Sequence, residues 1–208
     1  MLYNIFPNND IELNKCIEEA SKEYSGFFNI PNDEFSVCVF SMKKEIFDEF
    51  KSIKEDYVVA FACPRSNIIF ICNHDDIKNI YNDIEYKKLI KHEIVHVYAY
   101  MYVNFNKYVP NWLHEGLARY LSGQMISGEV CKDLETLFND NILPNVIYSG
   151  GGIFVKHLIE TYGNKKFLEF FNELRNLKSS NEVSIIFMKH YNKDIKEVLN
   201  EIVGENNK

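Results

Sequence analysis

The sequence contains 208 residues, of which 46% are hydrophobic, and it carries a formal net charge of −7. This composition is typical of a folded globular protein and argues against a disordered or fibrous chain. Acidic residues outnumber basic ones by 30 to 23, and no run of Lys or Arg stands out. We therefore expect no nucleic acid partner, since a protein that follows phosphates needs a basic face.

The five cysteines are an odd number and include no Cys-x-x-Cys pair, which argues against a disulfide framework and against a cysteine zinc site. The first residues, Met1–Pro7, lack the basic start and apolar stretch of a signal peptide. No apolar run approaches the roughly 18 residues that span a membrane. We expect a cytoplasmic protein without a membrane segment. The sequence gives no indication of an oligomeric state.

Residues 1–74 combine helical and strand patterns. Two runs rich in β-branched and aromatic residues flank Pro64-Arg65-Ser66, so we expect them to form an antiparallel pair. We expect the second of them, Asn67–Cys72, to be an edge strand. The elements predicted here are helices over Asp10–Tyr24 and Lys44–Ile53 and strands over Phe35–Met42, Tyr57–Cys63 and Asn67–Cys72.

Residues 75–208 show helical patterns only. Asn111 and Asn164 are the predicted N-caps of two of these helices, and Gly123 and Gly163 follow helix ends. The order of elements predicts an α+β fold, with one domain over residues 1–208 made of an α/β portion (1–74) and a helical portion (75–208). The predicted helices are Asp76–Tyr81, Ile84–Tyr102, Trp112–Leu121, Gly150–Tyr162, Lys165–Leu177, Glu182–Tyr191 and Lys193–Ile202.

The long predicted helix contains His92-Glu93-Ile94-Val95-His96, which has the pattern H-E-x-x-H. Residues four apart share one helical face, about 6 Å from each other, so His92 and His96 can bind one zinc ion. Glu93 projects beside this pair and can act as a general base towards a water molecule. The alternative is an amphipathic helix with two surface histidines, although two histidines are costly to bury without partners.

A catalytic zinc needs a third protein ligand and an open position. Glu115 follows His96 by 19 positions (115 − 96) on the next predicted helix, which leaves room for the chain to turn back towards the metal. Gly116 beside it allows a close approach between helices. His114 is the alternative third ligand, although histidine ligands at this place usually follow a different spacing with glycine.

The combination of H-E-x-x-H and W-L-x-E-G-x-A, here His92–His96 and Trp112–Ala118, resembles the gluzincin metallopeptidases. The similarity extends over roughly residues 57–203 and includes the peptidase MA-like bacterial domains and the catalytic domain of aminopeptidase-N relatives. It implies a zincin-like fold with an edge strand over the cleft and one Zn²⁺ ion. It also implies that His92, His96 and Glu115 are the zinc ligands and that Glu93 is the base of a peptidase.

Two further segments bear on this resemblance. Tyr148, before Gly150-Gly151-Gly152, is similar in position to a family tyrosine that donates a hydrogen bond to the oxyanion; the alternative is a tyrosine that anchors a loop. Aminopeptidase-N relatives also carry a G-x-M-E-N motif, whose glutamate holds the free amino group of the substrate. The corresponding stretch here is Phe61–Asn67, which lacks that glutamate.

We therefore expect a peptide or protein substrate and an endopeptidase or peptide-processing activity. One alternative is an aminopeptidase with another carboxylate as its amine anchor, for instance one on the turn after Asn73. The other is a catalytically inactive zincin-like module that binds or regulates. The candidates for substrate contacts are His114, Arg65 and Asn67, and Arg119 is a candidate to orient Glu115.

Overall fold

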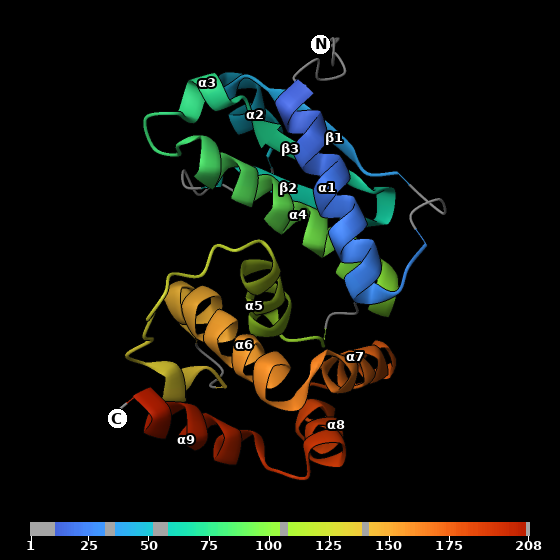
Figure 1. Ribbon diagram of the computed structural model, residues 1–208, viewed down its shortest axis with the longest axis vertical. Helices are drawn as coiled ribbons and strands as arrows, with labels where there is room; N and C mark the ends of the chain where they lie inside the picture. The colour runs from blue at the N-terminus through green and yellow to red at the C-terminus, as the bar shows by residue number, and fades with distance from the viewer. Residues whose placement is uncertain (1–10, 32–35, 52–57, 105–107, 139–141, 207–208) are drawn as a thin grey trace. The chain divides into compact units, whose positions relative to one another are not determined.

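In the computed structural model, the chain forms two compact units, Met1–Met101 and Tyr102–Lys208 (Figure 1). The structure describes residues 11–31, 36–51, 58–104, 108–138 and 142–206. Within these ranges, no helix has both the length and the apolar character needed to cross a membrane. Some predicted features lie outside the described residues. They are the segment Met1–Pro7 and the predicted ends of four elements, Asp10, Phe35, Ile53 and Tyr57.

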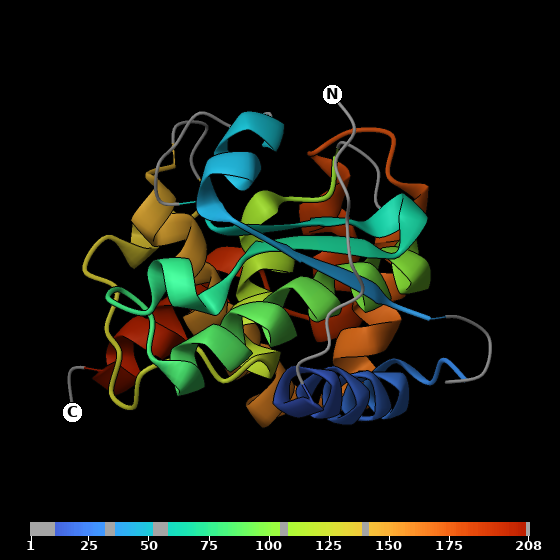
Figure 2. The same ribbon diagram turned by 90° about the horizontal axis from the view of Figure 1, so that it is seen from above.

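The first unit contains a three-stranded mixed sheet with the strand order β1-β3-β2 (Figures 1 and 2). Strand β1 (Cys38–Met42) pairs in parallel with β3 (Ile68–Cys72). Strand β2 (Ala60–Cys63) pairs with β3 in the antiparallel direction, and the short 3-10 helix η1 (Pro64–Ser66) connects the two. The α+β class and the antiparallel pair are thus confirmed.

The prediction that Asn67–Cys72 is an edge strand is wrong. Strand β3 is the central strand, and the edges are β1 and β2. The physical reason is that β1 reaches β3 through the connection that contains helix α2 (Lys44–Phe50), and this long-range parallel pairing has no local signal in the sequence.

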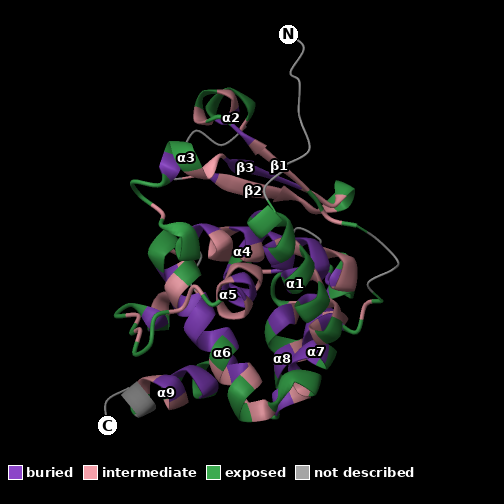
Figure 3. Ribbon diagram, turned by 45° about the horizontal axis from the view of Figure 1, so that its top comes forward, coloured by how far each residue is buried: buried purple, intermediate pink, exposed green. Residues whose placement is uncertain are grey.

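Helices cover the sheet on both faces. Phe70 of β3 contacts Phe50 of α2 at a ring-centroid distance of 4.7 Å, and Phe61 of β2 contacts Phe47 of α2 at 5.6 Å. Helix α4 (Asp83–Val103) lies on the opposite face (Figure 3). Because side chains alternate along a strand, the fully buried Ile69 and Ile71 point away from α2 towards that second face.

Helix α1 (Ile11–Phe28) packs beside α4 and ends four residues later than predicted. The extra turn is stabilised by Phe28, whose ring stacks on Tyr98 of α4 at 6.3 Å. The Tyr98 hydroxyl donates a hydrogen bond to the Ser21 carbonyl at 2.9 Å. Gly26 lies within the helix, and Phe28, two residues further on, is fully buried.

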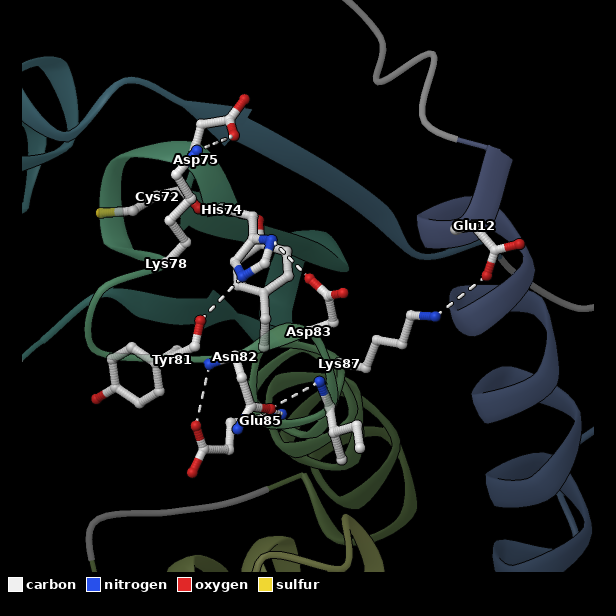
Figure 4. A network of polar contacts seen from close by, with 12 residues as sticks. Glu12, Cys72, His74, Asp75, Lys78, Tyr81, Asn82, Asp83, Glu85 and Lys87 are labelled. Carbon is white, nitrogen blue, oxygen red and sulfur yellow. Dashed lines mark hydrogen bonds and ion pairs between the residues drawn. The ribbon is translucent and has the colours of Figure 1, made fainter.

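The start of α4 is fixed by a polar network (Figure 4). The Asn82 side chain accepts hydrogen bonds from the amides of Ile84 and Glu85, and the Glu85 carboxylate accepts one from the Asn82 amide, each at 3.0 Å. This reciprocal arrangement is a capping box. His74, in the short helix α3 (His74–Ile77), contacts Asp83 at 3.4 Å through Nδ1 and the Tyr81 carbonyl at 2.9 Å through Nε2.

The described residues of the second unit form helices joined by turns and irregular segments and include no strand, as predicted for residues beyond 75. Its core includes Phe167, Phe170, Phe171 and Leu174, all fully buried. The portion of the chain that contains strands ends at β3, as expected. The first compact unit nevertheless continues to Met101, because α4 packs on the sheet and on α1. The helical elements of this unit are α5 (Asn111–Leu121), η2 (Leu134–Thr136), η3 (Val146–Gly150), α6 (Gly151–Tyr162), α7 (Asn164–Glu173), η4 (Leu174–Asn176), α8 (Glu182–Tyr191) and α9 (Ile195–Asn206).

The two predicted asparagine N-caps are wrong. Asn111 and Asn164 are the first residues of α5 and α7, and Pro110 and Gly163 occupy the flanking cap positions without a side-chain cap bond. Proline and glycine already set the backbone angles at these two helix starts, with Gly163 at a φ of 87°. The asparagine side chains are therefore available for other contacts.

Candidate metal centre

His92 and His96 lie one turn apart on α4, and their side chains meet. The two Nε2 atoms are 3.0 Å from each other, and the ring centroids are 4.7 Å apart. His92 is only 7% exposed. The predicted pairing of these imidazoles on one helical face is confirmed.

Glu93 is 9% exposed, which is unusual for a carboxylate. It follows His92 directly and precedes His96 by three positions, so it shares a helical side with His96. The neighbours Ile94, Val95 and Val97 are fully buried. The chain thus places one acidic group beside the imidazole pair in an otherwise apolar stretch of α4.

Glu115 of α5 completes a group that could hold a metal ion. One ligand atom from each of His92, His96 and Glu115 lies within 4.8 Å of the other two. A tetrahedral zinc ion with bonds of about 2.1 Å spaces its ligand atoms about 3.4 Å apart. The separation of the imidazole nitrogens, 3.0 Å, is close to this spacing, and the limit of 4.8 Å that includes the carboxylate oxygen exceeds it by about 1.4 Å. Two imidazoles and a carboxylate are also a ligand set that zinc uses in peptidases.

His114 does not belong to that group among the described residues. Its Nε2 atom is 3.2 Å from Oδ1 of Asn111, and its Nδ1 atom is 3.5 Å from Oε1 of Glu115. The asparagine predicted as a helix cap thus contacts the histidine that precedes the candidate ligand. Of the two residues considered as third ligand, Glu115, and not His114, belongs to the group of described residues that could hold a metal ion.

The position of Glu115 on α5 is fixed by a contact between glycines. A Cβ atom added at Gly116 would lie 2.3 Å from the carbonyl carbon and oxygen of Gly151 in α6, and one added at Gly151 would lie 2.3 Å from the Trp112 carbonyl oxygen. Helices α5 and α6 therefore touch backbone to backbone. The close approach predicted for Gly116 is confirmed, and its partner is the glycine run that follows Tyr148.

Tyr148 lies within η3, a single π-helical turn that leads directly into α6. Its side chain is 39% exposed, which leaves it accessible to a ligand. Single π-helical turns occur frequently at functional sites. The sequence placed Tyr148 just before a helix but did not predict the π-turn, because the turn depends on how Gly150 and Gly151 pack in the folded unit. The role of Tyr148 towards an oxyanion stays a prediction.

Arg119 does not contact Glu115 in the manner predicted; it binds Glu129 instead. Its two terminal nitrogens are 2.9 and 3.2 Å from the two carboxylate oxygens of Glu129, and both side chains are 14% exposed. Burial alone would raise the pKa of Glu129, but hydrogen bonds from Ser149, from Arg119 and from the Ile126 amide lower it below its ordinary value. Sequence analysis missed Glu129 and Ser149, since neither belongs to a motif.

The remaining candidates for substrate contacts lie around η1. The Nε atom of Arg65 donates a hydrogen bond to the Tyr100 hydroxyl at 3.2 Å, and Tyr100 is on α4, one turn beyond His96. Asn67 has a φ of 53°, and its carbonyl accepts a hydrogen bond from the Cys38 amide at 2.9 Å. The backbone of Asn67 thus forms the turn into β3. A substrate contact by either side chain stays a prediction.

Comparison of this chain with protein-family models, with curated proteins and with solved structures gave no match.

Proposed function

We propose that this protein is a zinc-dependent peptidase that cleaves internal peptide bonds. The observation that carries the proposal is the convergence of the His92, His96 and Glu115 ligand atoms within 4.8 Å beside the buried Glu93. Zinc bound there would supply Lewis acidity, which lowers the pKa of a water molecule towards about 7 and polarises a carbonyl.

The chain's own residues would perform the proton transfers. Glu93 takes a proton from the attacking water and later gives it to the departing amine. Its place beside His96 keeps it near the reacting atoms without making it a ligand. Tyr148 donates a hydrogen bond to the carbonyl oxygen as negative charge develops there.

An extended substrate would pair with a sheet edge, and the edges are β1 and β2. We favour β2, because the η1 turn that follows it contacts α4 at Tyr100, one turn beyond His96. The stretch Phe61–Asn67 that forms the end of β2 and this turn lacks a glutamate that could hold a substrate amino group. This absence within the stretch supports cleavage inside a peptide over removal of its first residue.

The decisive experiment compares the wild type with Glu93→Gln in zinc content and in cleavage of a peptide library. We expect one zinc ion per chain in both proteins and a loss of activity in the variant of about 10²–10⁴-fold, the usual contribution of a general base. The matched control is Glu85→Gln on the same helix, because glutamine retains the capping box with Asn82 and should leave activity unchanged.

Two results would overturn the proposal: a wild type that binds no zinc, or a Glu93→Gln variant that cleaves as fast as the wild type. A second arm uses peptides with and without an acetylated amino terminus. Equal cleavage of both supports an endopeptidase, whereas cleavage of the free peptides alone would identify an aminopeptidase. Zinc binding without any cleavage would indicate a binding or regulatory module instead.

A further inference from the structure

Glu129 lies in the segment between α5 and η2 and accepts hydrogen bonds from three separate parts of the second unit. The Ser149 hydroxyl donates to it at 2.6 Å, and the Ile126 amide donates at 3.2 Å. Arg119 donates through both terminal nitrogens, at 2.9 and 3.2 Å. The Arg119 guanidinium also reaches the Gln124 carbonyl at 3.4 Å.

The donors to Glu129 are neighbours of two candidate site residues. Arg119 lies four positions after Glu115, so the two share one face of α5. Ser149 follows Tyr148 directly inside η3. The carboxylate of Glu129 therefore connects the helix that carries a candidate zinc ligand with the turn that carries the candidate oxyanion donor.

We propose that Glu129 is a positioning residue, which holds the Tyr148 turn at a fixed place relative to Glu115 by bridging Ser149 and Arg119. The inference rests on the proposed function and deepens it, because it assigns a role to three residues outside the predicted motif. Glu129 itself is not part of the group that could hold a metal among the described residues. It acts through Tyr148 and does not touch the reacting atoms.

The geometry of this linkage differs from that of an ordinary surface ion pair. Exposed pairs contribute little because water screens them and because two long side chains must be ordered. Here the Arg119 guanidinium contacts both carboxylate oxygens of Glu129, and each of these two side chains is 14% exposed. The Ser149 hydroxyl and the Ile126 amide donate further hydrogen bonds to the same carboxylate. Such charge-assisted, bidentate contacts fix direction as well as distance.

The first test measures hydrogen exchange in the zinc-free protein, so that its result does not depend on peptidase activity. Glu129→Gln and Ser149→Ala should each speed exchange of the Val146–Gly150 amides by about tenfold or more, the factor expected for loss of a hydrogen bond to a charged group. The matched control is Glu173→Gln, which removes a carboxylate bound by Lys189 and His190. It should leave exchange of the Val146–Gly150 amides unchanged.

The second test is a double-mutant cycle on peptide cleavage. Ser149→Ala should lower kcat about tenfold at unchanged KM and unchanged zinc content, because the tyrosine loses its alignment and the metal keeps its ligands. In a Tyr148→Phe background, Ser149→Ala should have no further effect on kcat, since the hydroxyl that it positions is gone. Ser149→Thr, which keeps a hydroxyl, should restore most of the rate.

The outcomes separate the two proposals. Unchanged exchange in Glu129→Gln and Ser149→Ala would overturn the linkage, whatever the activity. Multiplicative effects of Ser149→Ala and Tyr148→Phe on kcat would show that the serine does not act through the tyrosine, and would overturn the positioning role. A wild type without zinc or cleavage would overturn the proposed function, while the exchange measurement would still decide whether Glu129 holds this turn.

Discussion

The contact between Gly116 and Gly151 leads to a sharp prediction for Gly116→Ala. The added Cβ would lie 2.3 Å from the Gly151 carbonyl carbon and oxygen and 2.9 Å from the Gly152 amide nitrogen. Ordinary contacts of a Cβ begin at 3.4 Å, so helices α5 and α6 would have to separate by about 1.1 Å (3.4 − 2.3). The obstructing atoms belong to the backbone, which cannot rotate away as a side chain can.

The expected cost follows from two opposing effects. Overpacking of a well-packed contact costs about 1–3 kcal/mol, and a backbone obstacle puts this case at the upper end. Alanine in place of glycine gains about 1 kcal/mol of helix stability. The free energy of unfolding of the second unit should therefore fall by about 2 kcal/mol, which is a factor of about 30 in the folding equilibrium constant. The affinity for zinc should fall as well, because Glu115 is the adjacent residue.

The assay is urea unfolding followed by the fluorescence of Trp112, the single tryptophan, which lies on α5 and is 3% exposed. Gly152→Ala is the matched control, since the nearest atoms to its added Cβ belong to the Met125 and Arg119 side chains, at 3.5 Å or more. This control should be as stable as the wild type or slightly more stable. If Gly116→Ala unfolds at the same urea concentration as Gly152→Ala, the backbone contact between α5 and α6 is not as described.

Two further predictions concern stability alone. Tyr98→Phe should lower the free energy of unfolding by about 1 kcal/mol in urea titrations, because it removes the part-buried hydrogen bond to the Ser21 carbonyl at 2.9 Å; no change would mean that water replaces the hydroxyl. The pKa of Glu129 lies below its ordinary value of 4.5, so its stabilising effect is present above about pH 4.5 and is lost as the pH falls through the lower folded pKa. Glu129→Gln should therefore weaken the pH dependence of stability on the acid side, and an unchanged acid transition would contradict this cause.

Local patterns predicted most helices of this chain because their signals are short in range. Helix α8 matches its predicted limits, Glu182–Tyr191, and α4 differs from its prediction by one residue at each end. The Asn82–Glu85 capping box is also a local signal, and it could have placed the start of α4 one residue earlier. By contrast, the order of the strands depends on a parallel pairing between β1 and β3, which no local pattern encodes.

The residues of the candidate site also divide into those that the sequence predicts and those that only the fold reveals. The histidine pair and Glu93 follow from helical spacing alone, and the choice of Glu115 follows from a motif. The contacts of Arg119 could not be predicted, because its partner Glu129 comes from an irregular segment ten residues away. The sequence associates Gly150–Gly152 with the segment that contains Tyr148. The contact of these glycines with Gly116 is evident only in the fold.

Helix α5 shows how one short helix can carry both contacts that fix a candidate ligand. Trp112 and Gly116 are four residues apart and share the face that meets the α6 backbone. Glu115 and Arg119 are also four residues apart, and their face is turned by about 100° from the first. The backbone contact between Gly116 and Gly151 therefore sets how close α5 approaches α6. The ion pair between Arg119 and Glu129 sets where the Tyr148 turn lies. Because the two contacts act on different faces, zinc affinity should respond to Gly116→Ala and not to Ser149→Ala.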